Sequence, residues 1–247
     1  MCHDDDSRAP APPVRAAVAG AGGITLTSTD GTPFGAYQAM PAGFGAGGPG
    51  IVLLPDVRGL HPYYRDLAVR FAEAGLPTVA VDYFGRTAGA SIERGDDFEW
   101  APHAQQVRPA TVEKDVAAAV EWLRSEAGAG PLFTVGFCLG GSQSWRLSAS
   151  SLDFAGVIGF YGMPKLVRSV LDQMRAPLLL LVAGADSATP RQEFADLDAA
   201  LTERGVEHDM VVYEGAPHSF FDRSYAQWHD AGADAWRRML SFVAAHS

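Results

Sequence analysis

The 247-residue sequence is 47% hydrophobic, which is enough for a sizeable core, and α/β folds of this length are often single domains. Its formal net charge of −10 argues against nucleic acid as a partner, because phosphate binding needs a basic surface. Neither a membrane span nor an apolar secretory signal is recognisable, and the two cysteines form no disulfide pattern, so we expect a cytoplasmic protein.

Residues 1–22 are predicted to form a flexible arm, since this stretch is rich in Ala, Gly and Pro. Residues 23–40 alternate in polarity around Asp30-Gly31, which is typical of an antiparallel hairpin. From residue 50 onward, solid apolar runs alternate with segments of helical spacing. Strands are expected at 50–56, 77–85, 132–137, 155–162 and 177–186, and a strand followed by a loop at 208–218. Helices are expected at 62–75, 111–126, from 139, near 166–174, at 191–205 and at 231–246.

Strands that are buried on both faces are apolar throughout, whereas half-exposed strands alternate. We therefore predict one α/β domain over residues 23–247, with a mostly parallel central sheet and helices on both faces. The hairpin adds antiparallel strands at its N-terminal side. The short stretch between the runs at 155–162 and 177–186 leaves no room for a cap domain.

Cys138 lies in the motif G-x-C-x-G, between the strand expected at 132–137 and the helix that follows. Chemistry gathers at the carboxyl ends of strands in such sheets, and the motif is typical of a nucleophile elbow with cysteine in place of serine. Gly136 and Gly140 would keep side chains away from the tight turn. The N-terminus of the helix would favour a thiolate and a developing oxyanion. The alternative is a small buried cysteine in a glycine-rich turn.

Two further residues follow Cys138 in the chain order nucleophile, acid, histidine. Asp186 closes the strand expected at 177–186, and His218 follows the next strand. Each of them alone would be a turn or loop residue. Their joint order and their places at strand ends favour a catalytic triad.

The motifs GFCLGG, AGAD and GAPHSF, with LPDVRG and VDYFGR, resemble those of the dienelactone hydrolases, a family of the α/β-hydrolase fold. The resemblance covers most of the chain. It implies that Cys138 is the nucleophile, that Asp186 is the acid that orients the histidine, and that His218 is the base. It also implies an oxyanion hole made by the backbone N–H groups of Val57 and Leu139, and neither a metal nor an organic cofactor.

Several charged positions bear on the substrate. Asp56 stands where the type member of the family has a glutamate thought to deprotonate the thiol. Arg86 matches the first of two arginines that grip a substrate carboxylate in the type member, but the second position holds Asp222, followed by Arg223. Arg58 adds a cation beside the expected oxyanion hole, so we expect an anionic substrate. A salt bridge from Asp56 to Arg58 or Arg86 is the alternative use of these charges.

The sequence therefore predicts a cysteine-dependent hydrolase of small carboxylic esters or lactones. Tyr161 and Phe220 either line its open cleft or pack in the core. A thioesterase or another carboxylesterase of the same fold is an alternative. A non-catalytic binding protein or redox sensor, in which Cys138 is an oxidisable thiol, is the alternative from another class. The oligomeric state stays open.

Overall fold

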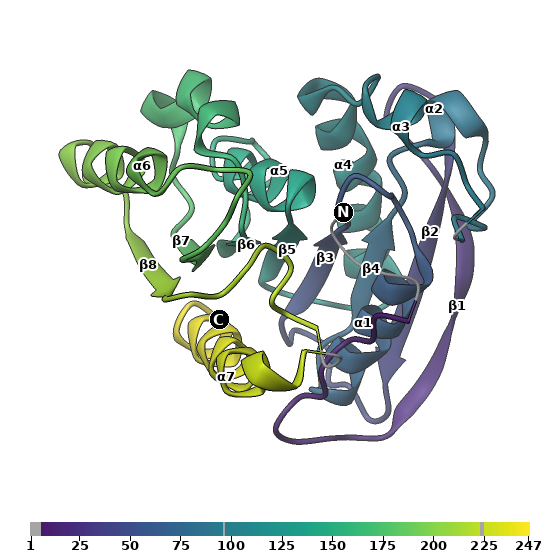
Figure 1. Ribbon diagram of the computed structural model, residues 1–247. Helices are drawn as coiled ribbons and strands as arrows, with labels where there is room; N and C mark the ends of the chain where they lie inside the picture. Colours follow the sequence, from purple (N-terminus) through teal and green to yellow (C-terminus); the bar gives the residue numbers. More distant parts are fainter. Residues whose placement is uncertain (1–5, 96, 223–224) are drawn as a thin grey trace.

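The computed structural model describes residues 6–95, 97–222 and 225–247. These residues form an eight-stranded sheet with the strand order β1-β2-β4-β3-β5-β6-β7-β8 (Figure 1). β2 pairs antiparallel with β1 and with β4, and all the other neighbours pair in parallel. This confirms the predicted α/β fold. The strands are β1 (Val18–Thr27), β2 (Pro33–Pro41), β3 (Gly50–Leu54), β4 (Thr78–Val81), β5 (Leu132–Phe137), β6 (Gly156–Phe160), β7 (Leu178–Ala183) and β8 (His208–Tyr213).

The helices form a layer on each face of the sheet, with α1 and α7 on one face and α4, α5 and α6 on the other (Figure 1). Along β3, Ile51 and Leu53 join the core beneath the first layer, while Val52 and Leu54 join the core beneath the second. Both faces of the sheet are buried, which explains the unbroken apolar runs in the sequence. The helices are α1 (Pro62–Glu73), α2 (Gly85–Ala88), α3 (Ala101–Ala104), α4 (Pro109–Ser125), α5 (Leu139–Leu147), α6 (Arg191–Glu203) and α7 (His229–Ala245).

The connection from β6 to β7 departs from the prediction. In place of one helix near residues 166–174 it contains two short 3₁₀ segments, η1 (Pro164–Leu166) and η2 (Arg168–Gln173), and a third, η3 (Ala226–Trp228), precedes α7. Val167, which is β-branched and thus a weak helix former, separates the first two segments. Within the described ranges, no helix is both long and apolar enough to cross a membrane.

The N-terminal boundary also differs from the prediction. β1 begins at Val18, so residues 18–22 belong to the sheet and not to a flexible arm. Glycines hid this strand, because they supply no alternation of side chains although their backbone pairs with β2. Of the preceding segment, Ser7, Ala9 and Pro12 are buried against the domain, and the Ala16 N–H donates to the carbonyl of Glu73 in α1.

Candidate active site

Cys138 occupies a sharp turn between β5 and α5. Its backbone has φ 54° and ψ −112°, a left-handed region that side-chain-bearing residues rarely enter. A Cβ at Gly136 would lie 2.0 Å from the carbonyl oxygen of Gly140, and a Cβ at Gly140 would lie 2.1 Å from that of Leu54. Both glycines are therefore required by close backbone approach. Such a conformation costs about 1–3 kcal/mol and persists only where the surroundings impose it.

Hydrogen bonds fix the elbow to its neighbours. The Cys138 N–H donates to the carbonyl of Phe160 in β6 at 3.0 Å, and the Cys138 carbonyl accepts the N–H of Ser142 at 3.1 Å. The Ser142 hydroxyl also donates to the Cys138 carbonyl and accepts the Met163 N–H at 2.7 Å. Cys138 is a free thiol and only 8% exposed. Leu139 begins α5, so its N–H has no acceptor within the helix.

Asp186 and His218 meet at the same edge of the sheet. Asp186 Oδ2 lies 2.7 Å from His218 Nδ1, and Asp186 Oδ1 accepts the N–H of Ala188 at 2.8 Å. The Asp186 side chain is 1% exposed and that of His218 is 17% exposed. Ser219, directly after the histidine, has φ 66°, so the chain turns sharply at this point. Both partners follow parallel strands, β7 and β8, as the sequence predicts.

Tyr161 links this pair to the elbow. It follows Phe160, whose carbonyl binds the Cys138 N–H, and its ring centroid lies 4.7 Å from that of His218. Phe220 is fully buried, with ring centroids 5.8 Å from Tyr161 and 6.2 Å from Phe160. Phe220 is thus a core residue, in agreement with the packing alternative, whereas Tyr161 touches the site.

The turn after β3 holds the second expected oxyanion donor. Asp56 is fully buried, and its Oδ1 accepts the backbone N–H of Arg58 at 2.8 Å. Its Oδ2 is buried without a hydrogen-bond partner among the described residues. Val57 is partly exposed, and Gly59 has φ 71°, which closes the turn.

Residues that the sequence analysis did not single out hold this turn. Asp82, after β4, is fully buried, and its Oδ1 accepts the Leu60 N–H at 3.3 Å. Arg94 donates to Asp82 Oδ2 from Nε at 3.2 Å and from Nη2 at 3.0 Å. Burial raises the pKa of Asp82 to about 6, against the opposing effect of Arg94. The Tyr83 hydroxyl donates to the Pro55 carbonyl at 2.9 Å. The sequence signal that could have identified Asp82 is its position at the end of an apolar strand.

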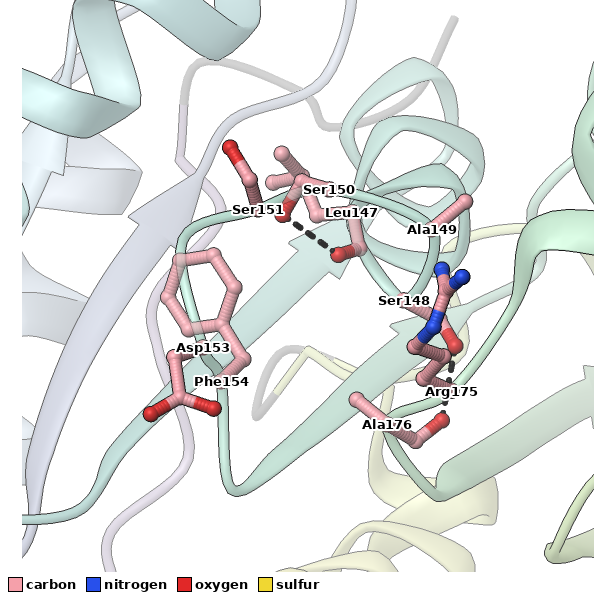
Figure 2. A pocket seen from close by; sticks show the side chains of 9 residues that line it. All are labelled: Leu147, Ser148, Ala149, Ser150, Ser151, Asp153, Phe154, Arg175 and Ala176. Carbon is pink, nitrogen blue, oxygen red and sulfur yellow. Dashed lines mark hydrogen bonds between the residues drawn. The ribbon is translucent and has the colours of Figure 1, made fainter.

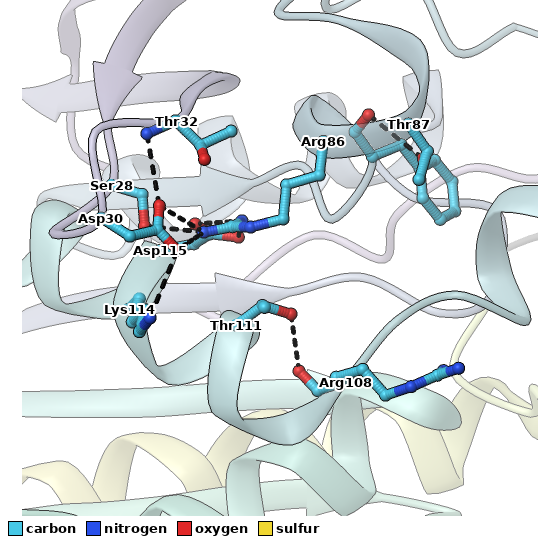
Figure 3. A network of polar contacts seen from close by, with 10 residues as sticks. Ser28, Asp30, Thr32, Arg86, Thr87, Arg108, Thr111, Lys114 and Asp115 are labelled. Atoms are coloured by element: carbon cyan, nitrogen blue, oxygen red, sulfur yellow. Dashed lines mark hydrogen bonds and ion pairs between the residues drawn. The ribbon is translucent and has the colours of Figure 1, made fainter.

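Arg86 does not take the place that the sequence predicts. Its guanidinium donates to both carboxylate oxygens of Asp115 in α4 at 2.7 Å, and to those of Asp30 in the β1–β2 turn at 2.8 and 2.9 Å (Figure 3). Ser28 and Lys114 complete this cluster. Arg86 therefore fastens the hairpin to α4, and the predicted carboxylate-gripping role is wrong. For the same reason Arg86 does not form the alternative salt bridge to Asp56, whereas a salt bridge from Asp56 to Arg58 stays a prediction.

Burial raises the pKa of the Asp115 carboxyl, although Arg86 acts in the opposite direction. Asp115 lies on the apolar face of α4 beside Val112 and Val116, which is a signal that the carboxylate needs a cationic partner.

Asp222 is buried and its carboxylate accepts the backbone N–H of Arg8 at 3.1 Å. Arg223 lies outside the described residues.

A pocket of about 380 Å³ lies at the C-terminal end of α5, opposite to the end that begins after Cys138 (Figure 2). Its lining includes none of the three predicted triad residues, so it is separate from the candidate site. The lining residues are Leu147, Ser148, Ala149, Ser150, Ser151, Asp153, Phe154, Arg175 and Ala176.

The comparisons with known proteins concern the fold and the family of the chain. The model of the dienelactone hydrolase family matches residues 34–247. A relative from Salmonella typhi, named "Putative carboxymethylenebutenolidase", is 26% identical over 240 residues, covering 91% of this chain and 87% of the relative. One from Bradyrhizobium sp, named "Probable 2-oxo-3-(5-oxofuran-2-ylidene)propanoate lactonase", is 26% identical and covers 85% of this chain and 89% of its own.

A crystal structure described as a "Putative Dienelactone Hydrolase", from Klebsiella pneumoniae, has a TM-score of 0.78 at 25% identity, covering 90% of this chain and 99% of the other. A parallel sheet that ends in such an elbow is the architecture of the α/β-hydrolases, and this chain is one of them. Because the family model spans most of its length, the chain belongs to the dienelactone hydrolase family. It is a hydrolase that acts on ester bonds.

Proposed function

We propose that the protein hydrolyses small carboxylic esters or lactones through Cys138, His218 and Asp186, by way of an acyl-enzyme. The observation that carries this proposal is the 2.7 Å contact between Asp186 and His218 at the sheet edge where the cysteine elbow lies. The names of the two relatives, a butenolidase and a lactonase, support a lactone as the substrate.

In the first half of the reaction, Asp186 holds the proton of His218 on Nδ1, which leaves Nε2 as the base. Nε2 takes the proton of the Cys138 thiol, and the thiolate sulfur forms a bond to the substrate carbonyl carbon. The N–H groups of Leu139 and Val57 stabilise the resulting oxyanion, each worth about 3 kcal/mol. The tetrahedral intermediate then collapses, and the leaving alkoxide takes the proton from His218. In a lactone the alkoxide stays attached to the acyl group.

In the second half, His218 removes a proton from water, and the hydroxide oxygen bonds to the thioester carbonyl carbon. Collapse of this intermediate expels the Cys138 thiolate and releases the carboxylic acid. The proton held by His218 returns to the sulfur, so the enzyme is regenerated without a net change. The positive end of α5 stabilises the thiolate in both halves.

An anionic substrate is supported by Arg58 and no longer by Arg86. Arg58 is 8% exposed and directly follows Val57, the expected oxyanion donor. The Arg86 guanidinium binds the carboxylates of Asp115 and Asp30. A charge-assisted contact contributes about 1.5–3 kcal/mol, so an anionic lactone should be preferred over its methyl ester by about ten- to a hundredfold. Arg58→Ala should remove most of this preference. Equal kcat/KM values for the acid and its methyl ester would contradict it.

The test of the function is turnover against a panel of lactones, simple esters and thioesters by the wild type and by Cys138→Ala. Ester and lactone hydrolysis should disappear in the folded variant. A preference for thioesters would identify a thioesterase of the same fold. A wild type that hydrolyses none of the panel but forms a reversible sulfenic acid on Cys138 would favour a redox sensor.

A further inference from the structure

The described N-terminal residues form a strap, which we define as residues 7–10. Ser7 is 4% exposed and Ala9 is fully buried, while Arg8 between them is exposed. This alternation is that of an extended segment with one face against the protein. The Ala9 N–H donates to Asp66 Oδ2 in α1 at 3.2 Å. The strap is therefore held to the helix layer on one face of the sheet.

Two more contacts of the strap reach α7 and the segment that contains His218. The indole N–H of Trp236 in α7 donates to the Pro10 carbonyl at 3.1 Å. The backbone N–H of Arg8 donates to Asp222 Oδ1 at 3.1 Å. Asp222 ends the segment 214–222, here called the His218 loop. The strap thus connects α1, α7 and the His218 loop through its backbone.

Burial makes the hydrogen bond from the Arg8 N–H important for the Asp222 carboxylate. It is 4% exposed, and a buried carboxylate is costly unless hydrogen bonds compensate its lost hydration. Its own N–H donates to the Phe220 carbonyl at 2.9 Å, so the end of the loop is a tight turn. The Phe220 ring packs against Tyr161, which contacts the His218 ring. We therefore expect a shift at Asp222 to reach the imidazole through these packed rings.

Tyr63 in α1 braces the loop from another side. Its hydroxyl donates to the Phe221 carbonyl. Burial, followed by the charges of Asp222, Asp66 and Asp56, raises the pKa of Tyr63 well above its ordinary value, so the phenol stays a neutral donor. The His218 loop is consequently held at two successive residues, by a helix side chain and by the strap backbone.

We propose that Asp222 is a positioning residue for His218, and that it acts by fastening the strap to the His218 loop. The N-terminal segment is then a working part of the active-site wall. This inference rests on the proposed role of His218 as the base. It predicts that one backbone N–H outside the catalytic machinery, that of Arg8, sets the placement of the imidazole.

The experiment removes this N–H with Arg8→Pro and compares it with Arg8→Ala, which loses the same side chain but keeps the N–H. Relative to Arg8→Ala, the proline variant should lower kcat by about tenfold, because small misplacements of a catalytic group are costly. KM should stay within about twofold. Asp222→Ala should lower kcat at least as much, and adding Arg8→Pro to it should lower kcat no further, since the Arg8 N–H has then already lost its acceptor. Equal kcat values for Arg8→Pro and Arg8→Ala, or multiplied effects in the double variant, would overturn the proposal.

A second readout does not depend on turnover. The indole N–H resonance of Trp236, assigned with Trp236→Phe, reports whether Pro10 is in place, and the ring resonances of His218, assigned with His218→Gln, report the imidazole. Both should shift in Arg8→Pro relative to Arg8→Ala. A shifted indole with an unmoved imidazole would contradict the coupling, whereas an unmoved indole would contradict the strap. If Cys138→Ala kept its activity, the proposed function would be refuted. The two sets of resonances would still report whether the strap and the imidazole move together.

Discussion

Replacing Asp186 with asparagine isolates the role of the triad acid. Asp186 Oδ1 accepts the Ala188 N–H at 2.8 Å, so the amide oxygen of an asparagine would stay on this donor. The NH₂ group would then face His218 Nδ1, where Oδ2 now lies at 2.7 Å. Nδ1 would become the acceptor and the ring proton would move to Nε2, which is the wrong tautomer for accepting a proton from Cys138. Because the Asp186 side chain is 1% exposed, little water can reach this contact and restore the correct tautomer.

We therefore expect kcat to fall by about 10³- to 10⁴-fold, which corresponds to about 4–5.5 kcal/mol of transition-state stabilisation. The assay is steady-state hydrolysis of the best lactone or ester of the panel. Asp196→Asn is the matched control, because Asp196 is an exposed acid of α6 that accepts a hydrogen bond from Gln192, one turn earlier in the helix, at 2.8 Å. If Asp186→Asn stays within about threefold of the control, another carboxylate orients the histidine and the reasoning is refuted.

Three further predictions concern stability and the elbow. Arg86→Ala should lower the free energy of unfolding by about 2–3 kcal/mol, because Asp115 stays buried without its cation, while the preference for an anionic substrate stays within about twofold; loss of that preference would restore Arg86 to the site. The pKa of Asp82 is raised to about 6, so the unfolded chain loses this proton first as the pH rises. Its contribution should thus fall by about 2 kcal/mol between pH 4 and 6, and denaturant unfolding of Asp82→Asn should lack this slope. Gly140→Ala should cost about 3 kcal/mol or more and most of the activity, whereas Gly20→Ala, with open space around it, should change the unfolding free energy by less than about 1 kcal/mol; equal costs would contradict the close-approach argument.

The backbone pattern carried most of the information about the fold and the site. Chain order and strand ends were enough to predict the contact between Asp186 and His218, because parallel strands bring their carboxyl ends to one edge. The glycines around Cys138 predicted the elbow for a reason that the structure bears out, namely the lack of space for a Cβ at Gly136 and Gly140.

Long-range pairing of charges could not be predicted in this way. The partners of Arg86 come from a hairpin turn and from α4, 56 and 29 residues away in the chain, and no local pattern announces either contact. The N-terminal segment was misjudged because a composition of Ala, Gly and Pro says nothing about backbone hydrogen bonds. Those of Arg8 and Ala9 depend on acceptors in the His218 loop and in α1.

The central claim is that Cys138 carries the acyl group, and intact-protein mass spectrometry after rapid mixing with an activated aryl ester tests it most directly. The wild type is a suitable sample, because the good leaving group of an activated aryl ester makes acylation fast relative to hydrolysis of the acyl-enzyme. The account predicts one acyl group per chain, located on the peptide that contains Cys138 and released by hydroxylamine as expected for a thioester. No adduct should form in Cys138→Ala. An acyl group on any other residue, or undiminished turnover by Cys138→Ala, would contradict the account.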